Sequence, residues 1–318
     1  RTVVPLTPRP LAMAAPPSLS CLLEEPRRLP PPPQDGMDTE SEWRDWAELP
    51  RDVLLAVLSR LDHIEILMGP DLVCSPWRRA ATDEPELWRL IDMRFHYADG
   101  FYLNSRKLLQ MVRAAMRRSA GRCEAFWGGS YVTERILSLV GNAAPSLKSL
   151  RLIECHDIVD LALKLVITKF PMLEELELSN CMHRFPETLE VVGDACPLLK
   201  RFRLSQRSFY SECVDDSAAM AIAKMPELRS LQLTANSLTN SGLELILNGC
   251  PLLESLDIRS CYHVCMDDEM QAKCARIKTL RHPEDSMDDY DMSFNYKIPR
   301  PCWSTEPIEY SMGCQSPY

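Results

Sequence analysis

The sequence predicts an α/β protein in which a small all-helical unit is followed by an open arc of strand–helix repeats. Residues 43–92 carry apolar side chains three and four positions apart, which is the spacing of amphipathic helices. Residues 145–261 return to one short leucine-containing pattern, and each return is followed by an amphipathic stretch. Strands and helices that alternate at a fixed period stack into a solenoid with one continuous core.

The composition excludes several classes of partner. The chain has 318 residues, of which 46% are apolar, so it can bury a sizeable core. Its 36 lysines and arginines against 45 acids give a net charge of −9, which disfavours binding of the whole protein to nucleic acid or anionic lipid. No stretch approaches the ~18 uncharged apolar residues that a membrane helix needs. We therefore expect neither nucleic acid nor membrane among its partners.

The two ends of the chain differ in composition from its middle. Residues 1–42 are predicted to form a disordered, proline-rich segment, because ten of the 25 prolines lie within residues 1–36. Met13 and Met37 are both candidate start residues. Residues 283–318 carry seven acids and two bases, and we expect them to form an acidic, mobile tail.

Three short helices are predicted within residues 43–92. The first includes Pro50 at its first position, which suits proline because that N–H group has no partner inside the helix. The third begins at Ser75-Pro76, with the serine as its predicted N-cap. Between them, Gly69-Pro70 is expected to break or shorten the second helix, since proline inside a helix costs roughly 3 kcal/mol.

Five repeats are clear in the second part of the chain, and one or two degraded units extend the array to 121–282. Each reads Pro-x-Leu-x-x-(Leu or Phe)-x-(Leu or Ile), at intervals of 26, 26, 29 and 25 residues. The repeats begin at Pro145, Pro171, Pro197, Pro226 and Pro251. The long third interval predicts an extended loop around 209–215.

Residues 93–120 lie between the helical unit and the repeats and predict a basic helix with an apolar stripe. Basic amphipathic helices of this kind bind membranes or calmodulin in some proteins. We instead interpret this segment as a linker helix that is docked on the repeats.

Together these pieces resemble F-box proteins with cysteine-containing leucine-rich repeats, in a short form like that of plants. The F-box resemblance rests on Leu49-Pro50 ahead of an apolar helix, Val73-Cys74 leading into Trp77-Arg78, and PELW at 85–88. It implies an F-box at 43–92 and a substrate-recognition subunit of a Skp–cullin–F-box ubiquitin-protein ligase. The F-box would bind a Skp-type adaptor and, through it, a cullin, while the repeats would bind a protein substrate.

Such a subunit is not an enzyme. In agreement, the sequence contains none of the common nucleotide-binding, metalloprotease or serine-hydrolase motifs. No cofactor is expected.

The apolar face of the first helix is the predicted adaptor surface. A three-helix unit of about 45 residues cannot cover all of this apolar surface by itself, so part of it should contact a partner. Leu49 and Pro50 match the family's contact positions most directly, whereas Trp77 equally suits the core. The predicted adaptor-binding residues are Leu49, Pro50, Val53, Leu54, Val57, Leu58, Leu61 and Trp77.

The predicted substrate surface is the face of the sheet opposite the strand leucines, because successive residues of a strand alternate between the two faces. The central column of this face consists of Arg151, Glu177, Arg203, Gln232 and Asp257. Neighbouring strands carry opposite charges in this column. The same pattern fits cross-strand pairs that only stabilise the sheet, and the two interpretations are compatible.

Thirteen cysteines raise the question of disulfides or zinc. Several recur at one repeat position, which predicts buried thiols in a reducing compartment and a cytoplasmic or nuclear location. Cys261, His263 and Cys265 lie close together, but no second cysteine pair completes a zinc pattern. We therefore expect no metal site.

Two other functions stay open. A repeat scaffold would work without a ligase if Gly69-Pro70 abolished adaptor binding. A small-molecule receptor would hold its ligand within the solenoid, but about six or seven repeats make an arc too short to enclose a pocket easily.

Overall fold

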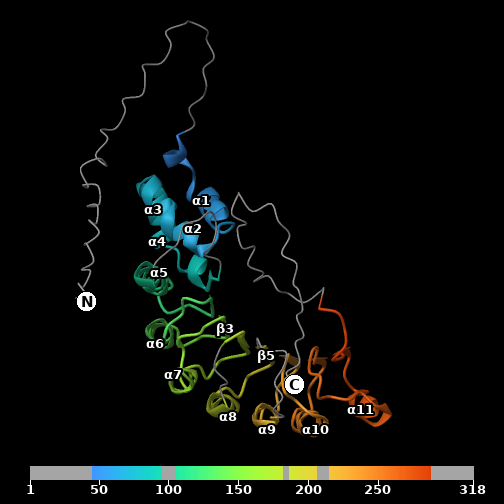
Figure 1. Cartoon of the computed structure of the whole chain (residues 1–318). Helices are drawn as coiled ribbons and strands as arrows, with labels where there is room; N and C mark the ends of the chain where they lie inside the picture. Colours follow the sequence, from blue (N-terminus) through green and yellow to red (C-terminus); the bar gives the residue numbers. More distant parts are fainter. Residues whose placement is uncertain (1–44, 95–104, 182–185, 206–214, 288–318) are drawn as a thin grey trace, which may run out of the picture. The chain divides into compact units, whose positions relative to one another are not determined.

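The computed structural model describes residues 45–94, 105–181, 186–205 and 215–287. The predicted proline-rich segment, most of the loop predicted around 209–215 and the tail from residue 288 onward lie outside these residues. Within the described part, the chain forms a helical unit followed by a parallel sheet (Figure 1). The predicted fold class is confirmed.

The N-terminal helical unit consists of short helices whose lengths follow from its glycine and proline positions. Its elements are η2 (Trp46–Glu48), α1 (Arg51–Leu58), α2 (His63–Met68), α3 (Pro70–Val73), α4 (Ser75–Thr82) and η3 (Pro85–Trp88). The N-cap of α2 is Asp62, which accepts a hydrogen bond from the Glu65 N–H group while the Glu65 carboxylate accepts one from the Asp62 N–H group.

The predicted break in the second helix is confirmed. Helix α2 ends at Met68, and α3 begins at Pro70 after one intervening residue, Gly69. Proline starts the new turn because it has no N–H group to continue the old one. The predicted start of the third helix was one residue off, since Cys74 is the N-cap of α4 and Ser75 is already helical.

In the described residues, eight parallel strands pair in chain order and form a single sheet. They are β1 (Leu90–Met93), β2 (Ala125–Gly128), β3 (Ser149–Ile153), β4 (Glu175–Ser179), β5 (Arg201–Ser205), β6 (Ser230–Thr234), β7 (Ser255–Asp257) and β8 (Thr279–Arg281). Each new repeat aligns with the previous one, so that equivalent residues stand in columns across the sheet.

A layer of helices follows the sheet on one side (Figure 1). These helices are α5 (Ser105–Arg118), α6 (Glu134–Ala143), α7 (Asp160–Ile167), α8 (Pro186–Ala195), α9 (Ser217–Ile222), α10 (Asn240–Gly249) and α11 (Asp268–Cys274). Between the two layers, one column of the core contains Leu150, Leu176, Phe202, Leu231 and Leu256, all of them buried. Among the described residues, no helix has both the length and the apolar character to cross a membrane.

The sheet begins earlier than predicted. Strand β1 was assigned to the all-helical unit, but it pairs with β2 in parallel, with Leu90 opposite Ala125. Helix α5, which was interpreted as a linker, lies between these two paired strands in the chain and packs beside α6. The predicted boundary at residue 92 therefore falls inside a strand. A four-residue strand has too little alternation to be recognised without its partner.

A turn with one left-handed residue follows four of the strands. The residues with positive φ at this place, between 53° and 60°, are Glu154, Asn180, Ala235 and Ser260. In three of these turns the next residue is a cysteine whose thiol donates to a carbonyl of the preceding repeat. These hydrogen bonds join Cys155 to Gly129 (3.3 Å), Cys181 to Leu152 (3.7 Å) and Cys261 to Leu233 (3.2 Å). The recurrent cysteines thus bond one repeat to the next.

We predict that Glu154→Gly, at a half-exposed residue with positive φ, stabilises the protein. A left-handed conformation costs a residue with a β-carbon roughly 1 kcal/mol, and glycine removes that cost. The expected gain is up to about 1 kcal/mol in the free energy of unfolding, measured by denaturant titration. The matched control is Glu190→Gly on the exposed face of α8, which should destabilise by about 0.5–1 kcal/mol. A loss of stability in both variants would contradict the prediction.

Candidate functional site

The apolar face of α1 divides into a buried and an exposed part. Leu54 and Leu58 point into the core and are almost fully buried, so the prediction that they contact an adaptor is wrong. Val53 and Val57 flank them and are exposed, as is Pro50 ahead of the helix. Apolar residues three and four positions apart form a stripe along one side of a helix. The residues in the middle of this stripe pack into the core, and only those at its edges stay accessible to a partner.

The remaining predicted adaptor residues are half-buried. Leu49 and Leu61 pack against the core from its edge. Trp77 also packs there, and its Nε1–H group donates to the Trp46 carbonyl at 2.8 Å. Trp77 therefore fastens η2 to α4, which is a structural role compatible with partial exposure.

Sequence reasoning missed three exposed apolar residues of the helical unit. They lie around the break at Gly69, where Met68 ends α2 and α3 carries Leu72 and Val73. Leu72 is 81% exposed. The signal was present in the sequence, because a leucine and a valine follow a helix break in a segment too short to bury them.

The helical unit is joined to the sheet through Trp88. This side chain is fully buried, and its Nε1–H group donates to the Ala81 carbonyl at 2.9 Å. The His63 ring lies 5.5 Å from it, and the Arg118 guanidinium of α5 lies 5.1 Å from the Trp88 ring. Trp88 thus contacts residues from both parts of the structure.

His63 reinforces the same junction with two hydrogen bonds. The backbone N–H group of Asp92 in β1 donates to Nδ1 at 3.2 Å, so Nδ1 must be an acceptor. The ring proton is then on Nε2, which donates to the Leu87 carbonyl at 3.0 Å. One histidine therefore connects α2 to η3 and to the first strand.

The predicted substrate column forms a row across the sheet. Arg151, Glu177 and Arg203 are direct neighbours in the strand register, followed by Gln232 and Asp257. Glu177 lies 3.6 Å from Arg151 and 3.4 Å from Arg203. The Gln232 side-chain amide donates to Asp257 at 3.1 Å. The cross-strand pairing that the alternating charges predicted is therefore present.

Burial corrects the prediction for one member of this column. Glu177 is only 3% exposed, because Arg151 and Arg203 flank it and Ser179 donates a hydrogen bond to its carboxylate at 2.8 Å. A residue held in this way stabilises the sheet and offers little surface to a substrate. Arg203 and Gln232 keep partial exposure and stay available.

The row continues toward β1 through residues that the sequence analysis did not single out. Trp127 of β2 stands beside Arg151, and its ring lies between two guanidinium groups, 4.6 Å from Arg94 and 4.3 Å from Arg151. Asp92 holds Arg94 with an ion pair of 2.8 Å. These residues were missed because β1 was not recognised as a strand.

Glu175 connects the row to the next column of the sheet. Its carboxylate lies 2.6 Å from Arg151 and 3.4 Å from Arg201 and accepts a hydrogen bond from Ser149 at 2.9 Å. Burial raises the pKa of this carboxyl group, but the charges and hydrogen bonds of its neighbours outweigh burial and lower its pKa below the usual value of 4.5. Arg201 is 63% exposed on its side chain and is the most accessible cation of this region.

The buried cysteines are poor nucleophiles and poor metal ligands. Burial raises the pKa of Cys261 to about 12 and that of Cys250 to about 11. Among the described residues, no group of three or more His, Cys, Asp or Glu side chains is arranged to hold a metal ion.

Comparison with known proteins supports the expected family. The F-box-like family model matches residues 46–94. F-box/LRR-repeat protein 23 of Arabidopsis thaliana is 38% identical over 80% of this chain, which spans 57% of that protein. The F-box protein SKIP19 of the same plant is 39% identical over 79% of this chain and 81% of its own length. F-box/LRR-repeat protein 22 of Arabidopsis thaliana is 38% identical over 80% of this chain and 82% of its own length.

The chain belongs to the F-box/leucine-rich-repeat family. The matched F-box extends two residues beyond the predicted boundary, to Arg94, and so includes the whole of β1. Among solved structures, the leucine-rich repeat protein LegL7 of Legionella pneumophila is 9% identical, with a TM-score of 0.44 over 73% of this chain and 78% of that chain. This likeness is too low to support an argument about function.

We predict that Glu175 makes the stability of the repeats depend on pH. Its pKa is lower in the folded than in the unfolded chain, so its contribution is present above about 4.5 and is lost as the pH falls through the folded-state pKa. Between about pH 5 and pH 3, wild-type protein should lose more free energy of unfolding than Glu175→Gln. Urea denaturation at several pH values measures this. The control Glu227→Gln, at an exposed site, should follow the wild type.

Proposed function

We propose that this F-box/leucine-rich-repeat chain is the substrate-recognition subunit of a Skp–cullin–F-box ubiquitin-protein ligase. The F-box binds a Skp-type adaptor, which connects to a cullin, and the repeats bind a protein substrate. The chain itself performs no chemistry, and the ligase acts by bringing substrate and ubiquitin-conjugating enzyme together.

The exposed apolar side chains of the F-box are the observation that carries this proposal. Val53 and Val57 on α1, together with Met68, Leu72 and Val73 around the helix break, are all exposed. Exposed apolar surface of this extent on so small a unit is typical of a protein-binding site. We place the adaptor contact on these residues, together with Pro50 and half-buried Leu49, instead of on the buried Leu54 and Leu58.

The break at Gly69 is compatible with adaptor binding in this proposal. It ends α2 early, yet it gives α3 its own direction and leaves Leu72 exposed. The break therefore replaces a continuous helix surface by two short ones and keeps apolar side chains available to a partner. A scaffold that works without a ligase is the competing function, and adaptor binding distinguishes the two.

For the substrate, we propose the face of the sheet that carries the charged row. Arg201 is exposed on β5, and Arg203 and Gln232 keep partial exposure although each pairs with a neighbour, as Arg151 and Asp257 also do. Both signs of charge are present and mostly paired, so the substrate need not be strongly charged. We also propose a cytoplasmic or nuclear location, in keeping with the free buried thiols of the described repeats.

We predict that Val53→Asp/Leu72→Asp abolishes adaptor binding. Two carboxylates would have to be desolvated at an apolar interface, which lowers affinity at least about 100-fold. Tagged protein expressed in plant cells should recover the Skp-type adaptor and cullin as wild type and neither as the double variant. Circular dichroism verifies that the variant stays folded, since both residues are exposed.

The matched control is Leu245→Asp, which places a carboxylate at a leucine of α10 in the repeats that is about as exposed as Val53. It should recover adaptor and cullin as well as the wild type. If Val53→Asp/Leu72→Asp recovers as much adaptor as the wild type, the proposed interface is wrong. If the wild type recovers no adaptor, the scaffold function is favoured.

A further inference from the structure

A surface groove lies on the helical side of the repeats, and none of its lining residues belongs to the F-box helices α1–α4 or to the charged row of the sheet. It is formed by three consecutive helices, α5, α6 and α7, which stand next to one another in Figure 1. Its volume is about 650 Å³. This is within the range of about 300–1,000 Å³ that is usual for binding sites.

The floor of the groove is apolar. It is lined by Leu109 of α5 and by Ala162, Leu165 and Val166 of α7. Leu165 is 61% exposed, and Leu161, one turn earlier on α7, is 60% exposed. Leucines one turn apart on an exposed helix face are suited to pack against the apolar side of another helix.

The rim of the groove is basic. Arg113 of α5, Arg135 of α6 and Lys169 just after α7 line it, against a single acid, Glu134. Within the part of the chain that the structure describes, neither Arg113 nor Arg135 forms an ion pair. Lys169 donates one hydrogen bond to Asn142 at 2.6 Å. The groove therefore offers positive charge that is not neutralised by its neighbours.

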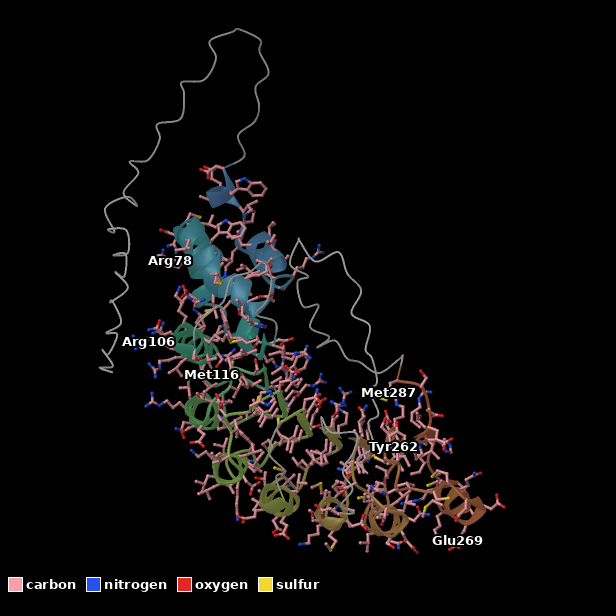
Figure 2. All side chains as sticks on the ribbon, viewed as in Figure 1. Arg78, Arg106, Met116, Tyr262, Glu269 and Met287 are labelled. Atoms are coloured by element: carbon pink, nitrogen blue, oxygen red, sulfur yellow. The ribbon has the colours of Figure 1, made fainter. Side chains whose placement is uncertain are left out.

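Helix α5 increases this local charge. It contains five basic residues and no acid, in a protein whose net charge is −9. Figure 2 shows Arg106 on the outer side of this helix, whereas Met116 is buried toward the core. The apolar stripe of α5 thus packs on the core, while Arg113 stays exposed at the groove.

The same positions elsewhere in the array are surrounded differently. Leu165 and Lys169 lie six and two residues before the repeat proline Pro171. Counted in the same way from Pro226, the equivalent residues of the α9 repeat are Met220 and Lys224. Met220 is 55% exposed, so the apolar position is similar. However, the preceding helix α8 bears three acids and no base, whereas α6 contributes Arg135 beside α7. The combination of an apolar floor and a basic rim therefore distinguishes the α5–α7 groove from the α9 repeat.

The shape of the site favours a protein segment over a membrane or RNA. A lipid surface is broad and cannot enter a groove between helices, and the acidic chain as a whole is repelled by anionic lipid. RNA binding ordinarily uses aromatic side chains for stacking, and none lines this groove. An amphipathic helix with acidic flanks matches both the apolar floor and the basic rim.

We propose that the α5–α7 groove is a second docking site, which binds an acidic amphipathic helix of another protein. The apolar side of that helix packs on Leu109, Ala162 and Leu165, and its carboxylates pair with Arg113, Arg135 and Lys169. The site is separate from the adaptor and substrate surfaces and does not depend on the function proposed for them.

The test uses fluorescently labelled peptides and the purified full chain. The first peptide is helical, with leucines at positions i, i+4 and i+7 and glutamates beside them. A second has every glutamate replaced by lysine, and a third has every leucine replaced by serine. Fluorescence anisotropy should show binding of the first peptide, at least about tenfold weaker binding of the other two, and weakening by salt.

Groove variants identify the binding site. Arg113→Glu/Arg135→Glu and Leu165→Ser/Lys169→Glu should each weaken binding of the acidic peptide about tenfold or more. The matched control, Met220→Ser/Lys224→Glu, makes the same kind of change at the equivalent positions of the α9 repeat and should bind as the wild type does. Thermal unfolding followed by circular dichroism verifies that all variants are folded.

Several results would overturn the proposal. The proposal is wrong if the acidic peptide does not bind, or if the lysine peptide binds as tightly as the acidic one. It is also wrong if the α9 control weakens binding of the acidic peptide as much as the groove variants do. Vesicles of phosphatidylserine form a further arm. If the chain binds these vesicles through Arg113 and Arg135 and ignores the peptide, the ligand is a membrane and the proposal is wrong.

Discussion

The structure depends on the burial of Trp88 where the F-box meets the first strand. No repeat can bury its leucines alone, so the array needs a cover at each end of its core. At the N-terminal end the F-box supplies this cover, because Trp88 is enclosed by His63, Ala81 and Arg118 while β1 continues directly into the sheet. One hydrophobic core therefore runs from α1 through the repeats. A substrate bound on the sheet and an adaptor bound on the F-box would be held by one continuous packed structure.

The repeats are held together by columns of equivalent residues, since a regular register places the same position of each unit side by side. One column buries leucine and phenylalanine, a second pairs Arg151, Glu177 and Arg203, and the cysteines after the strands donate to carbonyls of the preceding unit. Because most charges on the sheet are already paired there, the exposed positive charge of α5 stands out.

The predicted site shows where sequence reasoning stops. The recurrence of apolar residues every three and four positions correctly identified an apolar face on α1. The same recurrence is found whether such a face packs into the core or binds a partner. Leu54 and Leu58 are buried, whereas Val53, Val57 and Leu72 are exposed, and only the packing of α1 to α4 separates them. In the same way, Glu177 was predicted from alternation to face outward. It does so, yet two arginines from neighbouring strands cover it.

The sequence by itself determined the family, the order of its parts, the break at Gly69 and the strand–helix period, because each of these is encoded by residues close together in the chain. Only the tertiary structure decided that β1 opens the sheet, which leucines stay exposed, and that α5, α6 and α7 form a basic groove. The physical reason is that pairing, burial and unneutralised charge depend on neighbours about 25 or more residues away. A short strand or an arginine acquires its role from those neighbours.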